Sequence, residues 1–135
     1  MFLATKEQQR EDMVKYQISD RGVHCVHTLA AMQKVPREKF LPKHLRRFAY
    51  QDCPLPIDAE QTISQPYIVA LMTEALALEG GERVLEIGTG SGYAAAVLAE
   101  IAGEVFTIER IGLLAKKSDE VLNKLGYKNI EVLNA

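Results

Sequence analysis

The chain has 135 residues, of which 47% are hydrophobic and 25% are charged, and its formal net charge is −2. This composition predicts one folded globular domain and excludes a disordered protein, and the small net charge gives no electrostatic argument for a nucleic-acid partner. No apolar run approaches the ~20 residues of a membrane span. The two cysteines, Cys25 and Cys53, are far apart and form no CxxC motif. We therefore expect a cytoplasmic protein that binds neither nucleic acid nor a membrane.

The first part of the chain is predicted to be helical. Residues 5–18 are polar and helix-prone, and residues 23–35 form a second amphipathic segment. A short helix is expected over residues 43–50, after Pro42. Residues 52–58 are expected to be extended, because two closely spaced prolines prevent regular hydrogen bonding. The apolar face of the second helix would contain Val23, Val26, Leu29, Ala30 and Gln33.

A longer helix is predicted after the sequence TISQP. Pro66 suits the first helical position, because its missing N–H is one that a helix leaves unbonded in any case. Gln65 is then the N-cap, Ser64 lies just outside, and the helix extends to about Leu78. Residues 62–64 therefore lie where the free amides of a helix start can help to hold an anion. The simpler alternative is that their hydroxyl groups only cap the turn.

The rest of the chain alternates strands and helices. Strands are predicted at 84–87, 105–108 and 130–133, and a helix follows each of the first two. This alternation predicts an α/β fold with a parallel sheet and right-handed crossovers. We divide the chain into a helical segment with the TIS loop, residues 1–79, and the first half of a cofactor-binding domain, residues 80–135.

Between the first of these strands and its helix the chain reads EIGTGSGY. Glycine at positions 88, 90 and 92 removes side chains where φ is positive or where a ligand must touch the main chain. The spacing departs from the dinucleotide fingerprint GxGxxG, because Tyr93 occupies the position of its third glycine. No Gly-Lys-Ser/Thr of a phosphate-binding loop follows. The loop instead suits a ligand without phosphates, a sulfonium that carries an amino acid and an adenosine.

Two acidic residues support that interpretation. Glu86 can contribute negative potential near a sulfonium. Glu109 ends the second strand, where a carboxylate can accept two hydrogen bonds from a ribose diol. The pattern favours S-adenosyl-L-methionine over NAD as the cofactor.

Three segments of the chain resemble the protein-L-isoaspartate O-methyltransferase family. They are VPREKFLPKHLRRFAYQDCPLPI, QTISQPYIVALMTEAL and VLEIGTGSGYAAAVLAEIAGEVFTIER, and the resemblance extends from about Arg21 to Leu133. The glycine loop alone would indicate only a class I methyltransferase. TISQP is far more specific, because most methyltransferases have no counterpart. The resemblance implies a Rossmann-like class I methyltransferase fold preceded by a helical segment.

The implied activity is the repair of damaged proteins, by methyl transfer from S-adenosyl-L-methionine to the free carboxylate of L-isoaspartyl residues. Ser64 matches the family's active-site serine and would orient a carboxylate oxygen. No general base is required, because the carboxylate is already ionised at neutral pH. No metal is expected. The substrate-binding residues would be Thr62, Ile63 and Gln65. The cofactor-binding residues would be Glu86, Gly88, Thr89, Gly90, Ser91, Gly92, Glu109 and Arg110.

In the family, the third strand leads into an adenine-contacting turn, four further strands and a substrate-covering segment. We therefore expect an incomplete fold with only the first three parallel strands, the N-terminal part of a longer enzyme; a naturally short version is the alternative. Such a chain would be inactive alone. It would leave bare a strand edge, the sheet and both crossover helices, and could self-associate through that edge. Two other hypotheses remain open: a different class I methyltransferase, and a non-catalytic fragment.

Overall fold

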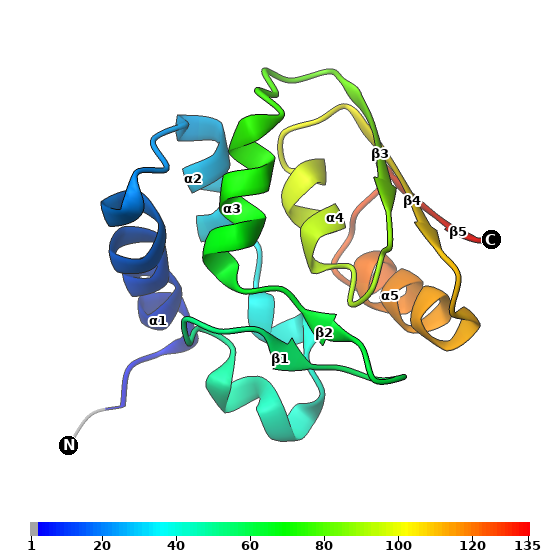
Figure 1. Ribbon diagram of the computed structural model, residues 1–135, viewed down its shortest axis with the longest axis horizontal. Helices are drawn as coiled ribbons and strands as arrows, with labels where there is room; N and C mark the ends of the chain where they lie inside the picture. Colours follow the sequence, from blue (N-terminus) through cyan, green and yellow to red (C-terminus); the bar gives the residue numbers. More distant parts are fainter. Residues whose placement is uncertain (1–2) are drawn as a thin grey trace.

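The computed structural model describes residues 3–135 and places a layer of helices beside a small parallel sheet (Figure 1). The first helix, α1 (Lys6–Asp12), begins at a capping box. The Thr5 hydroxyl accepts from the Gln8 amide, and the Gln8 side chain accepts from the Thr5 amide, both at 3.1 Å. The helix continues as a π-helical segment, Met13–Ile18, and a 3₁₀ turn, Ser19–Arg21. The prediction of a helix over residues 5–18 is confirmed.

Helix α2 (Val26–Lys34) exists as predicted. Its predicted apolar face is correct at Val23 and Leu29, which belong to or pack against the core, and wrong at Val26 and Ala30. Val26 is 72% exposed and Ala30 is also exposed. The buried side of α2 carries Thr28, Ala31 and Met32, which pack toward α3 and α4. Two stripes at helical spacing compete in this sequence. Tertiary packing buries the stripe that contains Thr28. This stripe was not predicted, because threonine counts as a polar residue in a hydrophobicity pattern.

The segment between α2 and α3 is built from short elements. Two 3₁₀ turns, Arg37–Phe40 and Lys43–Phe48, lead into strand β1 (Leu55–Pro56). This strand pairs antiparallel with β2 (Thr62–Ile63). The expectation of an extended segment is confirmed, but the expected lack of regular hydrogen bonding is wrong, because the Ile57 amide donates to the Gln61 carbonyl at 2.9 Å.

Helix α3 (Pro66–Ala75) has Pro66 in its first turn and Gln65 as its N-cap, as predicted. The helix ends before the predicted Leu78. Ala77 adopts a left-handed φ of 51°, which an α-helix cannot accommodate.

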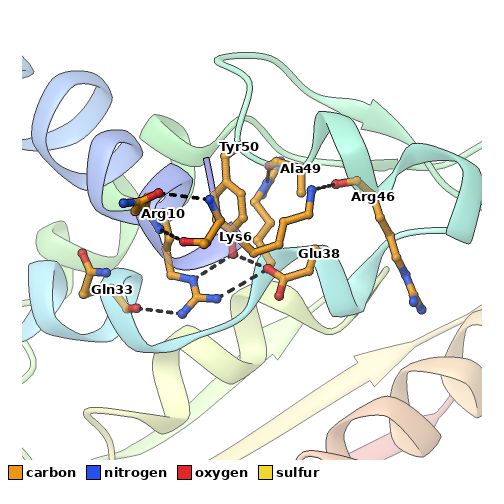
Figure 2. A network of polar contacts seen from close by, with 10 residues as sticks. Lys6, Arg10, Gln33, Glu38, Arg46, Ala49 and Tyr50 are labelled. Carbon is orange, nitrogen blue, oxygen red and sulfur yellow. Dashed lines mark hydrogen bonds and ion pairs between the residues drawn. The ribbon is translucent and has the colours of Figure 1, made fainter. Parts of the chain in front are cut away.

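A buried polar network holds the helical layer to the 3₁₀ turns (Figure 2). The Tyr50 hydroxyl donates to the Glu38 carboxylate and accepts from Nε of Arg10 at 2.8 Å. Nη1 of Arg10 also donates to the Gln33 carbonyl at 3.3 Å. Burial, reinforced by the Glu38 carboxylate, raises the pKa of Tyr50. The phenol therefore stays protonated and remains a donor at neutral pH.

The sheet consists of three parallel strands in the order β3-β4-β5. The strands are β3 (Arg83–Ile87), β4 (Glu104–Glu109) and β5 (Ile130–Asn134). They are joined by α4 (Tyr93–Ala99) and α5 (Gly112–Lys124), which confirms the predicted α/β alternation. No helix among residues 3–135 is long and apolar enough to cross a membrane.

One face of the sheet is buried by helices and the other is exposed. Val105 and Thr107 of β4 are buried beneath the crossover helices, whereas Leu85 and Ile87 of β3 are 62% and 74% exposed. β3 pairs only with β4 within the described residues. The predicted bare strand edge and sheet face are therefore present.

The prediction of bare crossover helices is wrong. Residues 95–99 of α4 are buried, because this helix lies between the sheet and helices α2 and α3 (Figure 1). Helix α5 buries Leu114 and Leu122. One buried cluster runs from Met13 in the helical layer to Tyr93 in α4, so the helical layer itself covers that side of the sheet.

Candidate functional site

A cavity of about 460 Å³ opens between α3 and the carboxyl end of β3. Its apolar part is lined by side chains such as Ile68 and Met72 of α3 and Leu85 of β3. Its polar part brings together eight of the residues predicted from the sequence: Thr62, Ile63, Ser64, Glu86, Gly88, Thr89, Gly90 and Ser91.

Two distant segments of the chain thus meet at this cavity. The pairing of β2 with β1 and the start of α3 position the TIS segment, while β3 and α4 position the glycine loop. Ser64 is exposed and lies on the cavity wall, where its hydroxyl can meet a ligand. Within residues 3–135, no three His, Cys, Asp or Glu side chains gather in a way that could hold a metal ion.

Four predicted site residues do not line the cavity. The Gln65 side chain turns away and donates to the Asp52 carboxylate at 2.6 Å. Arg110 is exposed at the end of β4. Gly92 and Glu109 are buried behind the loop and support it, as described below.

The glycines of the loop have two different tasks. Gly88 and Gly90 adopt φ values of 92° and 56°, and an added Cβ would meet nothing closer than 3.9 Å, at Ile57. They provide a left-handed main chain and an open cavity floor, as the sequence predicted. At Gly92 an added Cβ would lie 3.2 Å from Cβ of Ser118 on α5. Gly92 therefore allows close packing of α4 against α5.

Glu109 holds the loop in place. One carboxylate oxygen accepts from the Gly90 amide at 2.8 Å, and the other accepts from the Ile111 amide at 2.9 Å. These bonds could not be predicted from the sequence, because they depend on the register of β3 against β4. Each carboxylate oxygen has a second lone pair, but the side chain is buried and does not line the cavity.

Glu86 is part of a chain of hydroxyl groups that the sequence analysis missed. Thr107 donates to its carboxylate at 2.6 Å, and Thr107 in turn lies 2.6 Å from the Thr89 hydroxyl. Burial raises the pKa of Glu86 to about 7, and the negative charge of Glu109 adds to this effect, while the Thr107 bond opposes it. The only sequence signal was a threonine within the apolar strand β4. Glu86 is thus poised between its neutral and charged forms near neutral pH.

Residues 8–135 match the family model described as Protein-L-isoaspartate(D-aspartate) O-methyltransferase (PCMT). The chain is 67% identical over 124 residues to Protein-L-isoaspartate O-methyltransferase 1 of Rhodopseudomonas palustris strain HaA2, covering 92% of this chain and 51% of that protein. It is 55% identical over 130 residues to Protein-L-isoaspartate O-methyltransferase 2 of Pelobacter propionicus, covering 96% of this chain and 58% of that protein. The chain spans about half the length of the curated relatives it matches.

Solved structures give the same fold. One, described as a protein-L-isoaspartate O-methyltransferase, superposes with a TM-score of 0.76 at 31% identity and covers 97% of this chain and 42% of that chain. A second, from Plasmodium falciparum, is described as a beta-aspartate methyltransferase in complex with S-adenosyl-L-homocysteine. It superposes with a TM-score of 0.78 at 24% identity, covers 93% of this chain and 62% of that chain, and supports the fold alone. The predicted Rossmann-like class I methyltransferase fold is confirmed.

The raised pKa of Glu86 predicts a pH-dependent stability. A carboxyl group whose pKa rises from 4.5 to about 7 on folding binds its proton more tightly in the folded state. The free energy of unfolding therefore falls as the pH rises from about 4.5 to about 7, by up to ~1.4 kcal/mol per pH unit. Glu86→Gln removes the titrating group while keeping an acceptor for Thr107, so its unfolding free energy should vary less over this range.

Urea unfolding at pH 5 and pH 8 measures this difference. Glu131→Gln, which changes an exposed glutamate on β5, is the control and should retain the pH dependence of the unmodified chain. An unchanged pH dependence in Glu86→Gln would contradict the assignment.

Proposed function

The chain belongs to the protein-L-isoaspartate O-methyltransferase family, and we propose that it serves methyl transfer from S-adenosyl-L-methionine to the free carboxylate of L-isoaspartyl residues in damaged proteins and peptides. One observation carries this proposal: Ser64 and the loop from Gly88 to Ser91 line the same cavity. The acceptor-orienting residue and the cofactor loop predicted from separate motifs thus face a common space.

The glycine loop fits the proposed cofactor. Gly88 and Gly90 leave room for a ligand to lie against the main chain, and Glu86 lines the same cavity. A bound cation would favour the charged form of Glu86, because opposite charges at short range lower the pKa of a carboxyl group. When bound, S-adenosyl-L-methionine supplies an electrophilic methyl group on a positively charged sulfur. Glu109 keeps the loop in shape, and its hydrogen bond from a ribose hydroxyl remains a predicted contact, as does the contact of Arg110 with the cofactor.

The TIS segment fits the proposed acceptor. Ser64 is exposed in the cavity and would donate a hydrogen bond to one oxygen of the substrate carboxylate. Thr62 and Ile63 would form the adjoining wall. Gln65, whose side chain is bonded to Asp52, would support the substrate indirectly by holding the segment. The residues would contribute alignment, which can lower a barrier by ~7–11 kcal/mol when the geometry is well held.

A different class I methyltransferase is the first alternative. The solved tRNA (m1A58) methyltransferase of Aquifex aeolicus superposes with a TM-score of 0.53 at 36% identity, but covers only 60% of this chain. The solved protein-L-isoaspartate O-methyltransferase covers 97% of this chain, so the superposition includes the helical segment. This difference favours the repair function. It also supports treating residues 1–79 as the segment that adds the substrate loop to the cofactor-binding residues 80–135.

A non-catalytic association module is the second alternative. No described residue pairs with the second side of β3, and its residues Leu85 and Ile87 are exposed, so we propose that the chain self-associates through this edge. Nucleic acid and membranes are not proposed as partners.

The cofactor proposal predicts that Gly90→Val abolishes the binding of S-adenosyl-L-homocysteine. Valine would fill the cavity floor with a branched side chain. Gly126→Val is a matched control, because Gly126 also has a positive φ, of 89°, but does not line the cavity. Isothermal titration should show binding to the unmodified chain and to the control. Affinity in Gly90→Val close to that of the control would remove the glycine loop from the cofactor site.

The acceptor proposal predicts that Ser64→Ala lowers kcat/KM for an isoaspartyl peptide by ~10-fold or more, the effect of losing one hydrogen bond to a charged group. The assay uses a chimera that joins this chain to the C-terminal remainder of the 67% identical relative. Cofactor affinity should not change, and Ser19→Ala, outside the cavity, should retain full activity. An equal loss of cofactor binding would make Ser64 a structural cap.

The association proposal predicts that light scattering of the purified chain shows dimers or larger species. Leu85→Lys places a charge beside the free edge and should shift the chain toward monomer. Leu113→Lys changes a leucine that is 50% exposed on α5 and should have no such effect. If light scattering shows that the unmodified chain stays monomeric at high concentration, association through β3 is excluded.

A further inference from the structure

Arg37 is buried without a carboxylate partner. Its exposed fraction is 0%, and no carboxylate within the described residues lies within ion-pair distance of its guanidinium. The neighbouring Glu38 is already bound by Arg10 and Tyr50 (Figure 2). Burying an arginine in this way is costly, because the charge loses its water without gaining an opposite charge.

The Arg37 guanidinium contacts three separate parts of the chain. Its Nε donates to the Ala49 carbonyl at 2.7 Å, and its Nη2 donates to the Ser64 carbonyl at 2.9 Å. Its Cζ also lies 4.8 Å from the centre of the Tyr93 ring. A planar guanidinium can make these contacts together, because its donors point in fixed directions and its face stacks on aromatic rings.

Two of these contacts lie on opposite sides of the candidate site. The Ser64 carbonyl belongs to the peptide that leads into Gln65, the N-cap of α3. Tyr93 is the first residue of α4, directly after the glycine loop. The Tyr93 ring is itself fixed by an edge-on contact with Phe40, at a centroid distance of 5.7 Å. Arg37 therefore links the serine segment to the base of the glycine loop.

We propose that Arg37 is a positioning residue that sets Ser64 against the glycine loop, and so aligns the carboxylate acceptor with the methyl donor. This inference rests on the proposed function. It explains why a charged residue occupies a buried position at which an apolar side chain would avoid the desolvation cost. It also explains the buried Nη1, which has no hydrogen-bond partner within the described residues. The bonds of Nε and Nη2 set the orientation of the guanidinium, and this orientation leaves Nη1 without a hydrogen bond.

Hydrogen–deuterium exchange of the chain tests the proposal. Arg37→Lys keeps the charge but cannot bridge two carbonyls and a ring, whereas Arg46→Lys is a matched control on the following 3₁₀ turn. In the ligand-free chain, the amides of residues 62–65 should exchange about tenfold faster in Arg37→Lys than in the control. The amides of α5 and β5 should be unaffected. If exchange becomes faster by the same factor throughout the chain, Arg37 only stabilises the fold. If exchange at residues 62–65 does not become faster, Arg37 does not hold this segment. Either result overturns the proposal.

A second measurement separates positioning from stability. S-adenosyl-L-homocysteine added to the unmodified chain or to Arg46→Lys should slow exchange at residues 62–65. In Arg37→Lys it should not, although the ligand affinity stays within about threefold. Tyr93→Leu removes the stacked ring and should abolish the same coupling, which keeps the test available if Arg37→Lys does not fold. Coupling that persists in both variants would overturn the proposal. If neither the unmodified chain nor the chimera described above binds the ligand, the proposed function fails, while the ligand-free comparison still decides the role of Arg37.

Discussion

The loop between β3 and α4 depends on the end of β4, which holds it by hydrogen bonds. The amides of Gly88 and Thr89 both donate to the Ile108 carbonyl, at 2.7 and 3.2 Å, and the Gly90 amide donates to Glu109 at 2.8 Å. A main chain with positive φ has few intrinsic preferences that would keep it in one shape. These bonds supply that shape, so the cavity floor exists only once the two strands have paired.

The hydroxyl groups of Thr89 and Thr107 extend the same constraint to Glu86. Because these side chains are buried beneath α4, the carboxyl group has little water to stabilise its charge, and its pKa rises to about 7. Negative charge at this position is therefore conditional. A cation in the cavity would favour the charged form of Glu86, so the protonation of this carboxyl group would be coupled to the binding of a positively charged ligand.

The other side of the site depends on the helical layer. Tyr93 occupies the position of the third glycine in the dinucleotide fingerprint, and its ring points toward Phe40 and Arg37 and is fully buried. The close approach to α5 is made one residue earlier, at Gly92. The aromatic ring thus joins the two parts of the chain. The free edge of β3 is, in contrast, a surface that the described residues leave uncovered.

Features controlled by local chemistry could be predicted from the sequence alone. Alternating apolar strands and helices predicted the parallel sheet, Pro66 marked the start of α3, and the glycine spacing marked the ligand loop. The motif TISQP together with that loop indicated the family, because both are short and contiguous. Each of these signals lies within a few residues of the structure that it specifies.

The remaining features depend on contacts between elements that are distant in the sequence. The buried face of α2, the amide bonds of Glu109 and the contact of Arg37 with Ser64 all join residues from different elements. No periodicity or motif encodes such pairs, because each depends on how elements distant in sequence pack in space. The sequence could therefore name Ser64 and the glycine loop, but the packing of the helical layer against the sheet brought them to one cavity.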